Sequence, residues 1–255
     1  MRPSKFLPYK FKTHLVAFQN FVVQKMIVKR FLINDPSQDL IRLGSSYGGW
    51  WVPTNILLGD SDKVLISAGL GWDVSLDEEL LKKNFVVIGI DPLEECVDFA
   101  KTKLHKYKDF HVINMGLCNF SGEALFYPPN VEGHDSWSLT NAHANYVGRP
   151  RVMRVITLEK TINQFDLNLY ESISILKMDI EGAEELLIPE VIKLNTNFDC
   201  LLIEFDFVSL ISFLNIRERI KKISLARKFL QQLNNKGYTL VHNENFNFTW
   251  VKSKI

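Results

Sequence analysis

Residues 238–251 read Tyr-Thr-Leu-Val-His-Asn-Glu-Asn-Phe-Asn-Phe-Thr-Trp-Val, and this stretch decides the expected fold. Two runs rich in β-branched and aromatic residues, 238–242 and 246–251, flank the polar turn at 243–245, which is a β-hairpin pattern. Just before them, Gly237 stands where a glycine in the left-handed conformation ends a helix. A long helix that reaches about Asn235 is therefore expected to lead directly into an antiparallel pair of strands.

Five short apolar runs precede this hairpin, with helical segments between them. The runs are Val64–Ile66, Phe85–Ile90, Phe110–Ile113, Ile173–Met178 and Cys200–Ile203. Strands that alternate with helices form a parallel sheet with right-handed crossovers. Together with the hairpin, they predict an α/β fold with a seven-stranded, mostly parallel sheet whose last strand inserts antiparallel.

The composition excludes several classes of protein. The chain has 255 residues, is 46% hydrophobic and 23% charged, and carries a formal net charge of +1, so it is neither disordered nor strongly basic like many nucleic-acid-binding proteins. Its three cysteines show no CxxC spacing, which argues against a disulfide framework or a zinc site. No apolar run approaches the ~18–20 residues of a membrane span, and no signal peptide is recognisable. A cytoplasmic protein is expected.

Charge is uneven along the chain, because residues before Asp35 include lysines and arginines but no acidic side chain. Leu15, Phe18, Val22 and Met26 follow a helical spacing among them, which predicts a basic amphipathic helix. We therefore divide the chain into a basic helical extension, residues 1–40, and a main domain, residues 41–255. The extension either packs on the main domain or contacts a membrane surface or a protein partner.

A glycine turn and an acidic residue point to a nucleotide-type ligand. Gly69-Leu70-Gly71 follows the first strand, and Asp91 closes the second strand 22 positions after Gly69. An acidic side chain at that place can accept hydrogen bonds from a ribose diol, although Asp is also a common helix N-cap. The third glycine of a GxGxxG motif is replaced by Val74, which weakens the dinucleotide interpretation. An NAD(P)-dependent oxidoreductase stays an alternative at this point.

The segment Leu176-Lys177-Met178-Asp179-Ile180-Glu181-Gly182-Ala183-Glu184 resembles the K-x-D-x-E-G-A-E signature of the FkbM-type methyltransferases, which depend on S-adenosylmethionine (SAM). Residues 155–159 are similar to the "TLD" step of that family, with Glu159 in place of Asp. Residues 43–50 and 69–76 resemble its GGW segment and its G-x-G-x-D-x-S-[FL] loop. The resemblance covers roughly residues 42–251, and it implies a Rossmann-like class I methyltransferase fold, SAM as the cofactor and a reaction that needs no metal.

The resemblance also implies where the cofactor binds, because α/β sheets bind ligands at the carboxyl ends of their strands. The methionine end is expected at the turn after the first strand, the ribose at Asp91 and the adenine beyond the third strand. The expected cofactor-binding residues are Ser67, Gly69, Gly71, Asp73, Asp91, Asn114, Met115 and Gly116. Two positions depart from the pattern of SAM enzymes, since Ser67 replaces a common acidic residue and Trp72 replaces a small or polar one.

Asp179 and Glu181 are the candidate catalytic residues, because they follow a strand at the edge where the methyl group would lie. A placed general base contributes about 10²–10⁴-fold to a rate. Their alternative role is to stabilise the start of the next helix. Glu184 lies one helical turn further and is expected to be structural, and Glu204, at the end of the fifth apolar run, is expected to border the acceptor.

The stretch from Pro128 to Pro150 is too polar for a core element and too long for an idle connection. It contains His134, Ser136, Trp137 and His143, a mixture suited to a hydroxyl-rich ligand. We expect it to cover the acceptor site, with His134 as an alternative base. The predicted reaction is O-methylation of a hydroxyl on a sugar, a glycan or a small molecule.

Two further interpretations stay open. Tyr47-Gly48-Gly49-Trp50-Trp51 either joins the extension to the domain as an aromatic plug or forms a wall of the acceptor site. A non-catalytic protein that binds a partner through its basic extension would share the same fold. Nucleic-acid methylation is not expected, because Met178-Asp179-Ile180-Glu181 stands where a base-stacking NPPY-like motif would follow the fourth strand.

Overall fold

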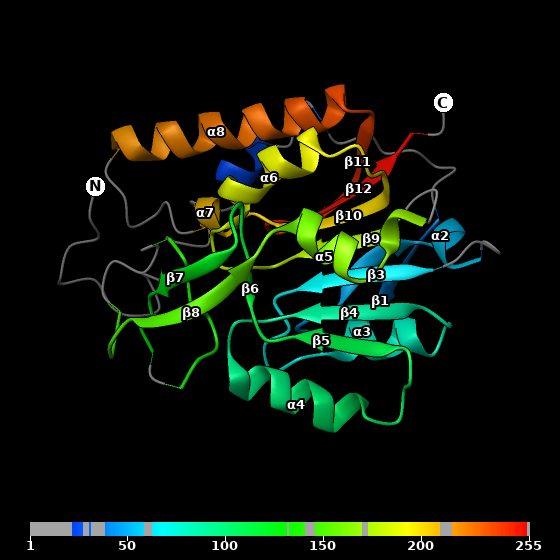
Figure 1. The fold of residues 1–255 in the computed structure, drawn as a ribbon. Coiled ribbons are helices and arrows are strands. Elements are labelled where there is room, and N and C mark those ends of the chain that lie inside the picture. The colour runs from blue at the N-terminus through cyan, green and yellow to red at the C-terminus, as the bar shows by residue number, and fades with distance from the viewer. Residues whose placement is uncertain are drawn as a thin grey trace.

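The computed structural model describes residues 22–27, 31, 39–58, 63–131, 133–140, 146–169, 173–209 and 216–253. Its centre is a seven-stranded sheet (Figure 1). In spatial order the strands are β11 (Tyr238–Glu244), β12 (Asn247–Lys252), β10 (Phe198–Glu204), β9 (Ile173–Met178), β3 (Val64–Ala68), β4 (Val86–Ile90) and β5 (Phe110–Ile113). The last strand, β12, runs antiparallel between β10 and β11, and the strands from β10 to β5 are parallel. The predicted seven-stranded sheet with an inserted antiparallel strand is confirmed.

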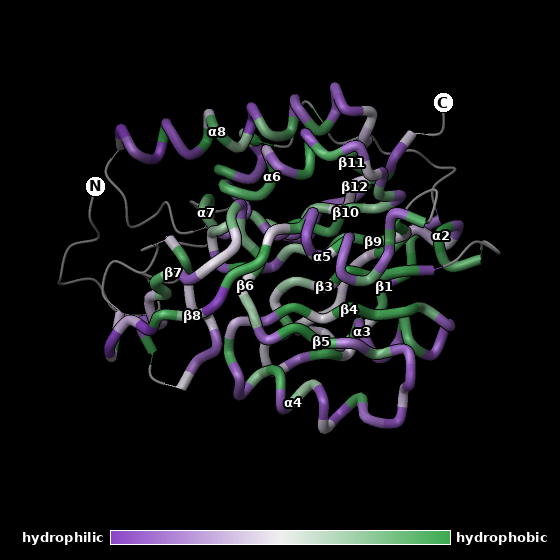
Figure 2. The backbone as a smooth tube through the Cα atoms, in the orientation of Figure 1, coloured by the Kyte–Doolittle hydropathy of each residue, from purple (hydrophilic) through white to green (hydrophobic). Residues whose placement is uncertain are grey.

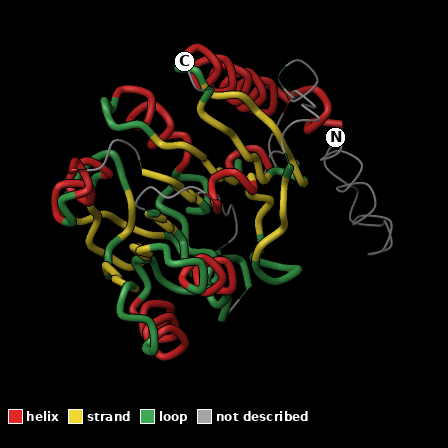
Figure 3. The backbone as a smooth tube through the Cα atoms, turned by 90° about the vertical axis from the view of Figure 1, so that its right-hand side faces the viewer, coloured by secondary structure: helices red, strands yellow, loops and turns green. Residues whose placement is uncertain are grey.

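Helices cover both faces of this sheet (Figures 1 and 3). One face packs on α5 (Leu158–Gln164), α6 (Glu184–Lys193) and α8 (Ile216–Asn235). The other packs on α3 (Ser75–Leu81), α4 (Glu94–Leu104) and the hairpin of β1 (Leu40–Leu43) and β2 (Trp50–Pro53). Because both faces are covered, the central strands are apolar throughout rather than alternating, as Figure 2 shows for β3, β4 and β10.

The helix boundaries follow local hydrogen bonds that the sequence pattern did not reveal. Asp91 is not the N-cap of the next helix, because α4 begins at Glu94 with Leu93 as its N-cap, and the Asp91 carboxylate accepts the N–H of Leu93 (2.8 Å). Between β10 and β11 lie the short α7 (Asp206–Ser209) and then α8. The end of α8 at Asn235 agrees with the prediction, and Gly237 has the expected positive φ of +92°.

A second, three-stranded sheet was not predicted. It consists of β6 (Gly116–Leu117), β8 (Arg151–Ile156) and β7 (Gly122–Phe126), in that order. The polar stretch 128–150 connects β7 to β8, so this sheet carries it to the edge of the main domain. The short helix α2 (Thr54–Leu58) follows β2.

The described part of the N-terminal extension packs on the domain. Residues 22–27 are helical, and Val23 and Ile27 are buried in the same core as α8. Arg227 of α8 donates two hydrogen bonds to the carbonyl of Met26, at 2.7 and 3.2 Å. Leu15 and Phe18 lie outside the described residues. Among the residues that are described, no helix has the length and apolar character to cross a membrane.

Candidate active site

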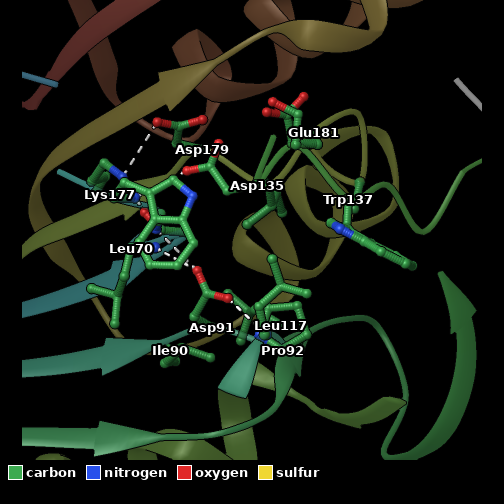
Figure 4. Close-up of a pocket in the computed structure, with 18 of the residues that line it drawn as sticks. Leu70, Ile90, Asp91, Pro92, Leu117, Asp135, Trp137, Lys177, Asp179 and Glu181 are labelled. Atoms are coloured by element: carbon green, nitrogen blue, oxygen red, sulfur yellow. Dashed lines mark hydrogen bonds and ion pairs between the residues drawn. The ribbon is translucent and has the colours of Figure 1, made fainter. Parts of the chain in front are cut away.

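A cavity opens at the carboxyl edge of β3, β4 and β9, where the sequence placed the ligand (Figure 4). It spans about 860 Å³, space open to solvent included. The predicted site residues that line it are Gly69, Gly71, Asp73, Asp91, Gly116, Ser136, Trp137, Asp179 and Glu181.

The glycine turn after β3 needs glycine for two reasons. Gly69 and Gly71 have φ values of +82° and +54°, which side chains disfavour. A Cβ at Gly69 would also lie only 1.7 Å from the backbone oxygen of Asp179. The turn and the loop after β9 are therefore in direct backbone contact.

Asp91 both lines the cavity and holds this turn. One carboxylate oxygen accepts the N–H groups of Leu70 and Gly71, at 2.9 and 3.1 Å, and the other accepts Leu93. Burial raises the pKa of Asp91, while the three hydrogen bonds act in the opposite direction. Figure 4 shows its carboxylate next to Leu70 at the middle of the cavity wall.

One end of the cavity is acidic. Oxygens of Asp179, Glu181 and Asp206 lie within 4.8 Å of one another, a spacing that a single cation can bridge. Burial, reinforced by the charge of Asp179, raises the pKa of Glu181 to about 7, against a hydrogen bond from Ser136. Burial and neighbouring carboxylates hold the pKa values of Glu204 and Asp206 well above their ordinary range.

Three acidic groups near this end of the cavity do not line it, namely Glu184, Glu204 and Asp206. Glu204 is not a lining residue, but it hydrogen bonds to Asp179. Glu184 is fully buried, and its Oε1 accepts the N–H groups of Ile180 and Gly182 at 3.0 and 3.3 Å. It therefore shapes the turn that presents Glu181, whose φ is +55°.

Lys177 is the one basic side chain among the described residues that line the cavity. Its Nζ donates to the Gly69 carbonyl at 2.5 Å and lies 3.4 Å from the Asp179 carboxylate. Burial alone would lower the pKa of this ammonium, but the carboxylates of Asp179 and Asp77 outweigh burial and raise it. Lys177 is the first residue of the K-x-D-x-E-G-A-E segment, but no role was predicted for it from the sequence.

The other end of the cavity is apolar, and the sequence located it only in part. Gly116 lines it as expected, whereas Asn114 is exposed and donates to the backbone oxygens of Asp91 and Pro92, and Met115 packs against the main core. The apolar lining residues that were not predicted from the sequence include Leu93, Leu117, Phe126 and Leu139. Phe126 belongs to β7, a strand that no pattern in the sequence predicted.

The stretch between β7 and β8 contributes one wall. Trp137 lines the cavity, with the Arg151 guanidinium 4.7 Å above its ring, and Asp135 accepts the N–H of Trp72 at 3.0 Å. His134 is exposed and lines a neighbouring cavity instead. His143 lies outside the described residues.

The β1–β2 turn also contributes to the cavity wall. Tyr47 and Gly48 line the cavity, and Tyr47 is 84% exposed. The Asp73 carboxylate holds this turn by accepting the Ser45 hydroxyl and the Gly48 N–H. Trp50 packs in the core with α3 and α4, whereas Val23 and Ile27 of the extension pack in the core on the other face, so the structure supports the wall and not the plug.

Ser67 takes no part in the cavity wall. It is fully buried in β3, where it pairs with Lys177 of β9, and it is not among the lining residues. The expectation that it contacts the cofactor therefore has no support in the geometry.

Comparisons with known proteins were made for the whole chain. Residues 71–240 match the family model described as "Methyltransferase FkbM domain", and no curated protein matches. One similar solved structure is the Methanococcus jannaschii fibrillarin pre-rRNA processing protein, with 10% identity, coverage of 86% of this chain and 84% of that one, and a TM-score of 0.40. Another is a "putative caffeoyl-CoA O-methyltransferase" from Staphylococcus aureus, with 12% identity, coverage of 96% and 98%, and a TM-score of 0.43.

Proposed function

The chain belongs to the FkbM family of SAM-dependent methyltransferases, and on that premise we propose that it methylates a hydroxyl group of a sugar, a glycan or a small molecule. Family membership decides against the oxidoreductase alternative. The acceptor class and the catalytic roles are the proposal. The observation that carries it is the acidic pair Asp179 and Glu181 at the same end of the cavity as the glycine turn.

The residues of the cavity fit the cofactor. The glycine turn brings the backbone of Gly69 and Gly71 to the cavity wall, where a ligand can contact it. Asp91 offers a carboxylate to a ribose, Leu117 and Phe126 offer apolar surface to adenine, and the acidic end suits the cationic groups of SAM. When bound, SAM supplies an electrophilic methyl group on a sulfonium sulfur.

We assign Asp179 as the proton acceptor for the incoming hydroxyl. Its carboxylate lines the cavity beside the glycine turn, 3.4 Å from the Lys177 ammonium. Glu181, with its pKa near 7, is suited to hydrogen bond the same hydroxyl as donor or acceptor. His134 remains the alternative base, although its exposed position in the neighbouring cavity supports it less.

The acceptor is proposed to enter between the β1–β2 turn and the stretch after β7. Tyr47 lines the cavity from that turn, and Ser136 and Trp137 line it from that stretch. Holding the acceptor in line with the methyl group can lower the barrier by roughly 7–11 kcal/mol. Aromatic faces together with hydroxyl and carboxylate groups are suited to a sugar-like acceptor.

Titration calorimetry of SAM and S-adenosylhomocysteine into the full chain tests the cofactor side. We expect binding by the wild type, loss of binding in Asp91→Ala and no binding of NADH. Asp98→Asn, an exposed change on α4, is the control. Because Asp91 also holds the glycine turn, circular dichroism must show that its variant is folded. A folded wild type that binds neither compound would overturn the proposal.

Transfer of a labelled methyl group to a panel of glycosides and small alcohols tests the acceptor side. With an acceptor in hand, Asp179→Asn should lower kcat by about 10²–10⁴-fold, the usual contribution of a general base. SAM affinity should change far less. Methylation of amines but not of alcohols would refute the hydroxyl assignment.

A further inference from the structure

Lys177 is a charged side chain in a place where its neighbours are apolar. It lies in β9, the central strand, and is 5% exposed. On the same face of that strand, Ile175 packs with the apolar residues of α3 and α4. Burying an ammonium costs several kcal/mol unless it is paired and hydrogen-bonded, so its partners explain why it is there.

Those partners belong to separate parts of the site. The ammonium donates to the Gly69 carbonyl of the glycine turn at 2.5 Å, and it lies 3.4 Å from the Asp179 carboxylate at the end of its own strand. Asp77 of α3 and Glu204 of β10 also act on it electrostatically. Figure 4 shows Lys177 between the turn and Asp179, pointing along the cavity wall.

We propose that Lys177 is a positioning residue, whose ammonium fixes the cofactor-binding glycine turn and the Asp179 carboxylate relative to each other. The inference rests on the proposed function, in which the cofactor binds at the glycine turn and Asp179 accepts the proton, so that the distance between them affects the rate. A misplacement of about 1 Å in such a pair can cost about 10²-fold in rate. One buried cation that contacts both sides removes that freedom.

The backbone contact between Gly69 and Asp179 does not by itself fix the position of the Asp179 side chain. Gly69 already touches the Asp179 backbone oxygen, which fixes the two main chains. The Asp179 side chain is about one third exposed and is surrounded by other carboxyl groups. Without Lys177, repulsion from these groups would turn the Asp179 carboxylate away from the glycine turn.

The test uses SAM as the probe, so it needs no acceptor. Lys177→Met should weaken SAM binding about tenfold or more, the loss expected for one hydrogen bond from a charged group. Ser174→Ala is the matched control, because Ser174 is also a buried polar residue of β9 but accepts the Val64 N–H at the other end of the strand. Its SAM affinity should stay within about twofold of the wild type.

Chemical rescue separates positioning from a purely structural role. In Lys177→Ala, ethylamine should restore SAM affinity in proportion to its concentration, whereas ethanol should not. A structural role would lower Tm and leave the affinity of the folded protein unchanged. Lys177→Met that binds SAM as the wild type does would overturn the inference.

A double-mutant cycle tests the link to Asp179. The SAM dissociation constant is measured for Lys177→Met, for Asp179→Asn and for the double variant. The effect of the double variant should differ from the product of the two single effects by more than about threefold, as expected for groups in contact. Independent effects would refute the tie. Failure of the wild type itself to bind SAM would instead overturn the proposed function, so the two failures are distinguishable.

Discussion

At Gly69 no side chain fits between the glycine turn and the loop after β9. Gly69→Ala would place a Cβ 1.7 Å from a backbone oxygen, which cannot move aside cheaply. Gly133 has the same φ of +82° with nothing within 4 Å, so Gly133→Ala measures the backbone penalty alone, about 1–2 kcal/mol. We expect Gly69→Ala to cost at least ~2 kcal/mol more in urea unfolding. Equal losses in the two variants would show that the contact is unimportant.

Glu184 makes the stability of the protein depend on pH. Burial raises its pKa to about 8, from an ordinary value of 4.5 that the unfolded chain retains. The folded state therefore holds the proton more tightly, and the free energy of unfolding falls as pH rises through this range. Glu184→Gln keeps the oxygen that accepts Ile180 and Gly182 but does not ionise.

We therefore expect the Tm of the wild type to fall relative to that of Glu184→Gln between about pH 5 and pH 8. Differential scanning calorimetry across this range measures the difference. Glu159→Gln, an exposed change on α5, should follow the wild type throughout. Parallel curves for the wild type and Glu184→Gln would contradict the prediction.

Some residues of the site could be predicted from the sequence, and others could not. Gly69, Asp91, Asp179 and Glu181 stand at strand ends, where periodicity and the topology of a parallel sheet bring them together. Lys177 lies inside a strand, and one buried lysine in an apolar run gives no signal of what it contacts. Its role depends on three-dimensional contacts with Gly69 and Asp179 that no spacing reveals.

At the scale of elements, the helical segment 22–27 is tied to α8 rather than standing apart. Ile27 is fully buried in the core, whereas the neighbouring Met26 is 46% exposed. Ile27→Ala should destabilise the protein by about 2–5 kcal/mol, as a core truncation does. Met26→Ala keeps the carbonyl that Arg227 contacts and should change stability by no more than about 0.5 kcal/mol.

Denaturant unfolding of the full chain compares the two variants. Similar small losses for both would mean that this segment is a detachable appendage. A large loss for Ile27→Ala alone would place the segment within the cooperative unit of the domain.

Some strands could be predicted from their sequences and others could not. The strands β3, β9 and β10 are covered on both faces, so they appear as continuous apolar runs, and their parallel arrangement follows from the alternation with helices. β7 and β8 are partly exposed and carry polar residues such as Glu123 and Arg154, so no run or alternation marked them. The apolar end of the cavity, which β7 lines with Phe126, could therefore not be predicted from the sequence.

At the scale of the whole molecule, one sheet joins two apolar cores, and the cavity lies at its edge. A ligand that binds only the folded chain therefore stabilises all of it. At a hundred times its dissociation constant, SAM should add ~2.7 kcal/mol, which corresponds to a rise in Tm of about 5–10 °C for a protein of this size. Scanning fluorimetry should show this rise with SAM, no rise with NADH and none with SAM in Asp91→Ala. A rise with NADH of the same size would contradict the cofactor assignment.

The hydrogen bonds from the glycine turn to Asp91 have a consequence for the reaction cycle. The turn owes its shape to contacts within the chain, so it does not depend on the methyl group for its order. The spent cofactor, S-adenosylhomocysteine, keeps every part that this turn and Asp91 can recognise and should therefore leave slowly. Product inhibition is then built into the site, and sustained turnover depends on a separate reaction that removes the spent cofactor.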